Sequence, residues 1–123
     1  MSVDLLPQPA LQPKTEGVRH VLAAAGYSFA GFRWMLRETA FRHELLVAGT
    51  MLFIFGLAGV RTGDYVVQIG LILMLLAVEA LNTAIERIVD RVSPEFSIFA
   101  KETKDLGSFA VSCLLTINGV FAL

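Results

Sequence analysis

The sequence predicts an all-α integral membrane protein with three transmembrane helices and an N-terminal amphipathic helix at the interface. Of its 123 residues 55% are hydrophobic, and the mean hydropathy is +0.66. Soluble domains usually have roughly 45 to 50% apolar residues. Three long apolar runs supply the spans. They are expected to be helical because open strands would leave their edge amides unsatisfied in lipid.

The first 42 residues are expected to lie outside the bilayer core. Residues 1–16 contain three prolines and two acids, which predicts a disordered lead-in, and they lack the basic start and apolar core of a signal peptide. Residues 17–42 alternate apolar clusters with charges and are too interrupted to span. We expect an amphipathic helix in the interface, with Trp34 as an anchor. An ordinary helix packed on the span bundle is an equal alternative.

The three spans are predicted at about 43–60, 65–91 and 106–123, so that 17–123 forms one membrane domain. A span needs about 17 to 25 residues. The first and third are near the short limit, which favours local thinning of the bilayer over tilt. Cys113 lies alone in the third run, so no disulfide is expected.

Basic residues predict the orientation of the chain. Only Arg61 lies in the short loop between the first and second spans. The other flanking basic residues precede the first span or lie between the second and third: Arg19, Arg33, Arg37, Arg42, Arg87, Arg91, Lys101 and Lys104. By the positive-inside rule the N-terminus is cytoplasmic and the C-terminus lies outside. The net charge of -1 gives no indication of nucleic-acid binding.

The second run ends in a row of polar side chains, EALNTAIERIVD at 79–90. Glu79, Asn82, Glu86 and Asp90 are three or four residues apart, so a helix places them on one face. An acid in the bilayer interior costs roughly 3 kcal/mol on insertion scales and by default marks a functional site. Glu79 is the deepest of these acids. We therefore interpret the row as a site rather than the solvated end of a span.

Two chemistries use such carboxylates. One is a proton relay in a transporter, and the other is a divalent-metal site, since Mg²⁺ is commonly held by one or two carboxylates and substrate phosphates. Glu38, Glu44, Lys104 and Asp105 are candidates to complete the second. Lys104 is expected within one turn of the third span's N-terminus, where free amides favour a phosphate. The set favours phosphoryl transfer, although the sequence has no P-loop and no G-x-G-x-x-G motif.

EALNTAIERIVD followed by KDLGSFAV, with AAGYSFAGF and ETAFRHE upstream, resembles the bacterial diacylglycerol kinase family over residues 17–123. The resemblance implies a homotrimer in the bacterial inner (cytoplasmic) membrane, with composite active sites between subunits. It also implies phosphorylation of diacylglycerol from MgATP to give phosphatidic acid. Mg²⁺ is then the expected cofactor, and ATP, diacylglycerol and membrane lipids are the expected partners.

The resemblance also implies roles for single residues. Glu79 corresponds to the base on the lipid hydroxyl, and Glu38 and Glu86 to metal ligands. Arg19 and Ala24, with Glu79, are expected to bind the lipid substrate. The remaining expected positions bind the nucleotide, together with Glu38 and Glu86: Tyr27, Ser28, Asn82, Lys104 and Asp105.

Alternatives remain open from the sequence. The family usually has His-Glu-Leu where this chain has Ser97, Ile98 and Phe99, which removes one expected nucleotide contact. An undecaprenol kinase of the same fold would differ only in its lipid. A small proton-coupled exporter normally has four spans and a lone acid in the first, unlike this pattern. A purely structural membrane subunit would leave Glu79 unexplained.

Overall fold

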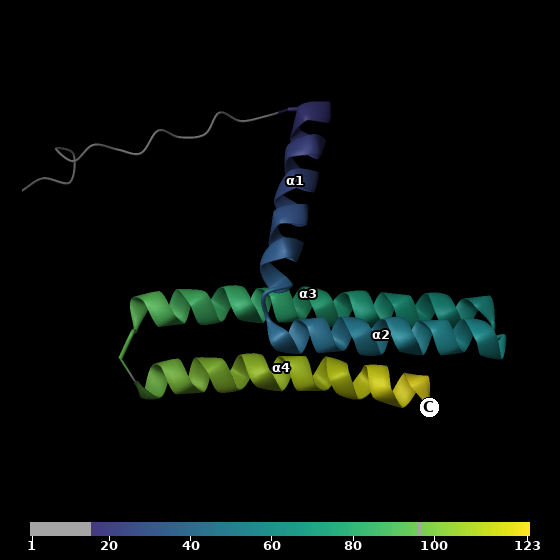
Figure 1. Ribbon diagram of the computed structural model, residues 1–123. Helices are drawn as coiled ribbons and strands as arrows, with labels where there is room; N and C mark the ends of the chain where they lie inside the picture. Colours follow the sequence, from purple (N-terminus) through teal and green to yellow (C-terminus); the bar gives the residue numbers. More distant parts are fainter. Residues whose placement is uncertain (1–15, 96) are drawn as a thin grey trace, which may run out of the picture. The chain divides into compact units, whose positions relative to one another are not determined.

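The computed structural model describes residues 16–95 and 97–123, which form four helices: α1 (Val18–Met35), α2 (Thr39–Ala58), α3 (Thr62–Val92) and α4 (Ile98–Ala122) (Figure 1). The prediction of an all-helical protein is confirmed. The prediction for 1–16 falls almost wholly outside the described residues. The chain divides into two compact units, one ending at Arg33 and the other comprising Trp34–Leu123, which we describe separately.

The helix expected over 17–42 is shorter in the structure, because α1 ends at Met35 and a turn follows. The Glu38 amide donates to the Met35 carbonyl at 2.9 Å. Glu38 itself has an extended backbone (φ -80°, ψ 123°) and is the N-cap residue of α2. The turn over 36–38 therefore separates α1 from the first span. The interfacial role of α1 stays a prediction.

Helices α2, α3 and α4 are each long and apolar enough to cross a membrane. With 20, 31 and 25 residues, they are about 30, 46 and 38 Å long at 1.5 Å per residue. The third predicted span is not at the short limit expected from the sequence, because its helix, α4, begins at Ile98 instead of 106. The Ser97 hydroxyl caps this start by accepting from the Ala100 amide at 3.0 Å. Helix α3 is much longer than the roughly 30 Å hydrocarbon core, so it is long enough to reach beyond it.

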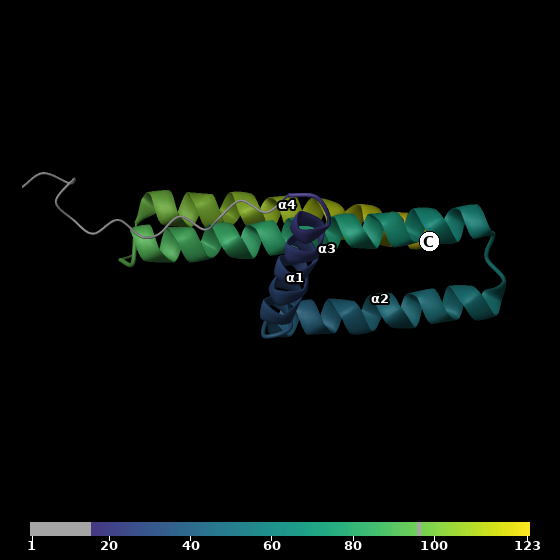
Figure 2. The ribbon, with the colours of Figure 1, turned by 90° about the horizontal axis from the view of Figure 1, so that it is seen from above.

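Gly59 ends α2 in a left-handed conformation (φ 68°), and the Val60 amide donates back to the Phe55 carbonyl at 3.2 Å. This is the usual way in which a glycine closes a helix. The chain then reverses within a few residues, so that α3 runs antiparallel to α2 (Figure 2).

Helices α3 and α4 form the closest packed pair, whereas α2 makes fewer contacts with α3 (Figures 1 and 2). The buried apolar side chains include Ile72 and Leu75 of α3 and Ala100 of α4. Most large apolar side chains of the three helices are exposed. Exposure of this extent is expected for helices whose outer solvent is lipid.

An amide pair also joins α3 to α4. Gln68, which is fully buried, donates through Nε2 to Asn118 Oδ1 at 2.9 Å. Asn118 Nδ2 in turn donates to the Leu71 carbonyl at 3.1 Å and the Leu114 carbonyl at 2.8 Å. Polar side chains within a membrane commonly connect helices in this way. The pair fixes the register of the hairpin at the end remote from Glu79.

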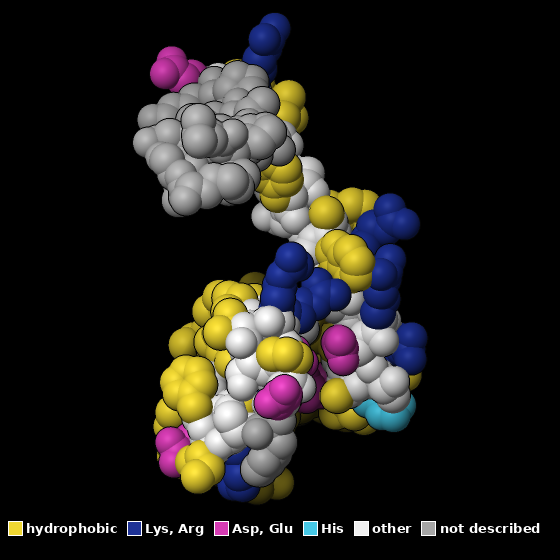
Figure 3. Space-filling model, turned by 90° about the vertical axis from the view of Figure 1, so that its left-hand side faces the viewer, with side chains coloured by type: hydrophobic (Ala, Val, Ile, Leu, Met, Phe, Trp, Pro, Cys, Tyr) yellow, Lys and Arg dark blue, Asp and Glu magenta, His cyan; other side chains and the backbone are white. Residues whose placement is uncertain are grey.

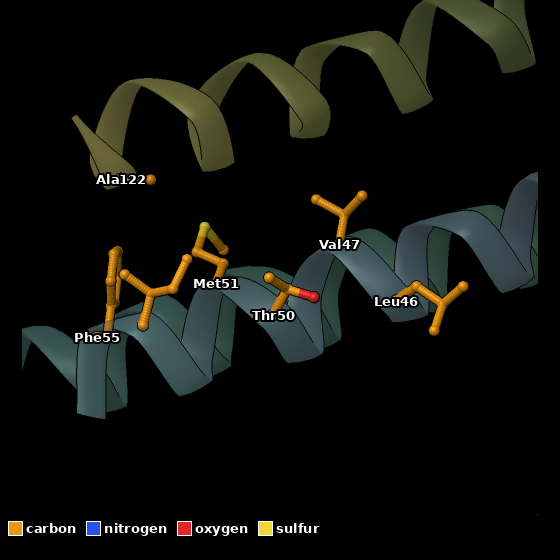
Figure 4. A pocket seen from close by; sticks show the side chains of 7 residues that line it. Leu46, Val47, Thr50, Met51, Phe55 and Ala122 are labelled. Atoms are coloured by element: carbon orange, nitrogen blue, oxygen red, sulfur yellow. The ribbon is translucent and has the colours of Figure 1, made fainter. Parts of the chain in front are cut away.

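A mostly apolar cleft of about 470 Å³, with Thr50 among its lining residues, lies between α2 and the end of α4 (Figure 4). Val47, Met51 and Phe55 of α2 point toward the end of α4 that carries Ala122, and Leu46 also lines the cleft. No titratable side chain lines it, so we do not regard this cleft as a reaction site.

Candidate functional site

The polar row expected on the second span lies on one face of α3. Glu79 is buried with 9% of its surface exposed, while Asn82 and Glu86 are half-buried. The Asn82 Nδ2 amide lies 3.5 Å from Glu86 Oε1, at the outer limit of a hydrogen bond. Asp90 is exposed and continues the row toward the helix end. The row thus passes from a buried acid to a solvent-accessible one.

Gly107 of α4 lies directly against Asn82. A Cβ added at Gly107 would overlap Asn82 Oδ1 and would lie 2.9 Å from its Cγ. None of the other glycines in the described part of the chain has an atom within 4 Å of such a Cβ. The missing side chain therefore makes room for the carboxamide between α3 and α4. Asn82 Oδ1 is itself buried and has no hydrogen-bond partner among the described residues.

Lys104 joins the row from α4. Its Nζ pairs with Asp90 Oδ1 at 2.7 Å, and Glu86 is near enough to act on it electrostatically. One prediction about Lys104 is wrong. It was expected within a turn of the helix N-terminus, but α4 begins at Ile98, so its own amide is inside the helix and is not free to bind a phosphate. Only its ammonium group can do so.

The deepest acid faces a second acid. The Glu44 carboxyl of α2 lies against the Glu79 carboxyl of α3. Within the described residues, the Oε2 atoms of both are buried and without a hydrogen-bond partner. Two buried acceptors without donors are uncommon in folded proteins and call for an explanation such as a catalytic role.

Among the described residues, two expected ones form no hydrogen bond or ion pair with this row. Asp105 is exposed and pairs with Lys101 Nζ at 2.7 Å. Glu38 lies at the turn before α2, where its exposed side chain makes no capping bond. Across 16–95 and 97–123 no three His, Cys, Asp or Glu side chains come together to hold a metal. A single chain therefore does not unite Glu38 and Glu86 in a complete metal cage.

Four expected positions lie on α1, in a different compact unit from this cluster. Arg19, Ala24, Tyr27 and Ser28 belong to the unit that ends at Arg33. All four are exposed. Their assignment to lipid or nucleotide stays a prediction.

Charged side chains concentrate at the end of the bundle where α3 ends and α4 begins. Viewed from this end, acidic groups lie beside basic ones, with apolar groups around them (Figure 3). Lys101, Lys104, Asp90 and Asp105 line a polar hollow there of about 310 Å³. The cluster is therefore open to water at one end and closed by apolar helices at the other.

Sequence reasoning missed three residues that join α3 to α4, one at the site and two at the opposite end of the hairpin. Gly107 was noted only as part of KDLGSFAV, although a glycine inside a helix often marks a close approach. Gln68 and Asn118 were passed over within apolar runs. Their polarity was the available signal, because polar residues inside spans are costly and usually paired.

The fold and the row together indicate a small helical membrane protein with three spans and a carboxylate site. Residues 26–123 match the family model described as "Prokaryotic diacylglycerol kinase". The match covers α2, α3, α4 and most of α1, and it excludes Arg19 and Ala24. The chain belongs to the prokaryotic diacylglycerol kinase family, which confirms the resemblance inferred from its motifs.

Curated relatives agree with this assignment. A diacylglycerol kinase of a Sinorhizobium species is 50% identical over 109 residues, covering 89% of this chain and 80% of the relative. The diacylglycerol kinase of Pseudomonas aeruginosa is 41% identical over 102 residues, covering 82% and 83%. That of Escherichia coli is 36% identical over 99 residues, covering 79% and 80%. The expectation of a lipid-kinase enzyme is confirmed by these relatives.

Proposed function

We propose that the protein phosphorylates the hydroxyl of diacylglycerol, using ATP, at the cytoplasmic face of the bacterial inner membrane. The observation that carries the proposal is the row on α3 from buried Glu79 to Glu86, with Lys104 brought onto it by α4. A lipid hydroxyl and a nucleotide phosphate must meet at the boundary between lipid and water. In the proposed orientation this row would cross that boundary.

Glu79 is the proton acceptor in this proposal. It lies seven residues before Glu86, hence about 10 Å deeper along the helix. When its carboxylate accepts the proton of the lipid hydroxyl, the oxygen forms a bond to the γ-phosphorus of ATP. The bond from that phosphorus to the β-phosphate bridge breaks, and ADP leaves. The Oε2 atom of Glu79 supports the role of proton acceptor, since it is buried and has no hydrogen-bond donor among the described residues.

The polar end of the row would hold the phosphates. Lys104 supplies a cation, and Asn82 supplies amide donors to phosphate oxygens. Glu86 and Glu38 are hard oxygen donors, and two carboxylates plus substrate phosphates are a common Mg²⁺ environment. The donor set fits the ion in chemical type, and a bound ion would neutralise charge on the transferring phosphate.

The active unit in this proposal is a homotrimer. The incomplete carboxylate set within one chain supports it, because Glu38 of one subunit could then serve the row of a neighbour. The N-terminus would lie in the cytoplasm, as the distribution of basic residues favours. α1 would then lie in the interface beside the site, with its tyrosine and serine toward the nucleotide.

The experiment uses purified protein in lipid micelles with labelled ATP and Mg²⁺. Diacylglycerol and undecaprenol are offered in separate reactions. Label in phosphatidic acid supports the proposal. Label in undecaprenyl phosphate alone would assign the protein to the other lipid, and no label in either lipid would refute kinase activity.

The role of Glu79 is tested with Glu79→Gln. We expect nearly normal MgATP binding and phosphate transfer at least about a hundredfold slower, the scale typical of losing a general base. Calorimetric titration of nucleotide is read beside the rate, with Asp64→Asn at the opposite end of α3 as a control. Nucleotide affinity that collapses together with the rate would assign Glu79 to the metal site instead, and Asp105 would become the next candidate base.

A further inference from the structure

A cluster of one tryptophan and two arginines shares no residue with the carboxylate row, although Arg87 follows Glu86 directly on α3. Trp34 is the single tryptophan of the chain. The guanidinium carbon of Arg37 lies 3.9 Å from its ring centroid and that of Arg87 lies 4.6 Å away. Both distances are within cation–π range. The ring thus connects the turn before α2 to α3 and holds two like charges near each other.

Among the residues that the structure describes, neither guanidinium forms an ion pair with a carboxylate. The ion pairs formed within 16–95 and 97–123 use other basic residues: Arg61, Lys101 and Lys104. Glu86 precedes Arg87 in the chain, but it faces Asn82 and Lys104 instead. Both arginines are exposed, and Trp34 is 47% exposed. Two unneutralised cations on a half-exposed ring attract an anion.

The turn that carries Arg37 is tied in place. Arg42 donates through NH1 to the Leu36 carbonyl and through NH2 to Thr39 Oγ1, both at 3.3 Å. The Arg37 amide donates to the Trp34 carbonyl at 3.1 Å. The Arg37 side chain therefore leaves the backbone from a fixed position. The cluster is partly preorganised before any ligand binds.

We propose that Trp34, Arg37 and Arg87 form a binding site for the phosphate group of an anionic membrane phospholipid. Arginine suits this ligand, because its planar donors match phosphate oxygens in pairs. Trp34 lies five residues before the start of α2, and tryptophan rings favour the boundary between headgroups and acyl chains. The ring would contact the glycerol and upper chains while the guanidiniums contact the phosphate.

The same phosphate chemistry could come from a soluble ligand. The position along α3 favours lipid: Arg87 lies eight residues beyond Glu79, about 12 Å along the helix, where a chain leaving the hydrocarbon core meets headgroups. The site is independent of the proposed kinase reaction, since it requires no nucleotide. The lipid-binding test can therefore fail while the kinase proposal holds, and the kinase proposal can fail while the lipid site is confirmed.

The test uses Trp34 as its own reporter. Full-length protein is placed in nanodiscs of equal parts phosphatidylglycerol and phosphatidylcholine, with bromine on the upper acyl chain of one lipid or the other. Bromine quenches tryptophan fluorescence only at close range. Quenching is compared between the wild type, the Arg37→Gln/Arg87→Gln variant and an Arg61→Gln/Arg91→Gln control that loses the same charge from arginines not stacked on the Trp34 ring.

In the wild type, brominated phosphatidylglycerol should be preferred over phosphatidylcholine by roughly fivefold per arginine, the effect of one basic residue near an anionic surface. The preference should fall to near unity in Arg37→Gln/Arg87→Gln and persist in the control. Arg37→Lys/Arg87→Lys should retain only part of it, because lysine lacks the planar fork. Equal quenching by both lipids in the wild type would refute the site without any variant.

Soluble ligands form the last arm. Inorganic phosphate and ATP are each added at millimolar concentration, against sodium chloride of equal ionic strength. Neither inorganic phosphate nor ATP should lower the preference for phosphatidylglycerol more than sodium chloride does. If either abolishes it at equal ionic strength, the cluster binds a soluble phosphate and the lipid assignment is overturned.

Discussion

Replacing Gly107 by alanine tests how strictly the α3–α4 interface positions the candidate site. The added Cβ would overlap Asn82 Oδ1 and approach Cγ to 2.9 Å. Asn82 must then leave its rotamer or the helices must separate, and Asn82 loses its contact to Glu86 Oε1. Overpacking of this kind typically costs about 1 to 3 kcal/mol.

If that cost falls on the transition state, phosphate transfer should slow by about 5- to 150-fold, since each 1.36 kcal/mol is tenfold in rate. The assay is labelled phosphate transfer to diacylglycerol in micelles, beside thermal inactivation. Gly119→Ala is the matched control, because it lies on the same helix and its Cβ would meet nothing within 4 Å. Transfer by Gly107→Ala within twofold of that control would refute the argument that Gly107 positions Asn82.

Three further outcomes are expected. Glu86→Gln should keep the helical fold and lose most turnover at ordinary Mg²⁺; activity within a few-fold of wild type would argue against a metal role. Mixing inactive variants altered at Glu38 and at Glu79 should restore some activity if subunits share sites, and no recovery in proven mixed assemblies would favour sites within one chain. Gln68→Leu should lower stability toward denaturing detergent by roughly 0.6 to 2 kcal/mol through loss of the bond to Asn118; an unchanged denaturation midpoint would contradict this.

Much of the site was visible in the sequence because it follows helix periodicity. Glu79, Asn82 and Glu86 are separated by three and four residues, which suffices to place them on one face of any helix. The free-energy cost of placing polar side chains inside an apolar run identified them as functional candidates. The same periodicity could not assign a partner to each of them. The facing of Glu44 and Glu79 depends on how α2 lies against α3.

Helix ends were less predictable than helix existence. Hydropathy placed the third span at 106, but Ser97 caps α4 and starts it at Ile98, because the charged residues Lys101, Glu102 and Lys104 that follow are tolerated beyond the hydrocarbon core. That difference moves Lys104 from a free helix end into the helix interior. Local capping chemistry decides such boundaries, and hydropathy does not measure it.

The sequence by itself determined that the protein is helical, that three of its segments suit a membrane, and which family it resembles, because composition and periodicity act within single helices. Only the tertiary structure decided that Gly107 makes room for Asn82 and that Gln68 pairs with Asn118. It also brought Arg87 onto the ring of Trp34. These contacts join residues that are distant in the chain, and they depend on the register in which one helix packs against another. Register is a property of two surfaces together, so no pattern within one segment specifies it.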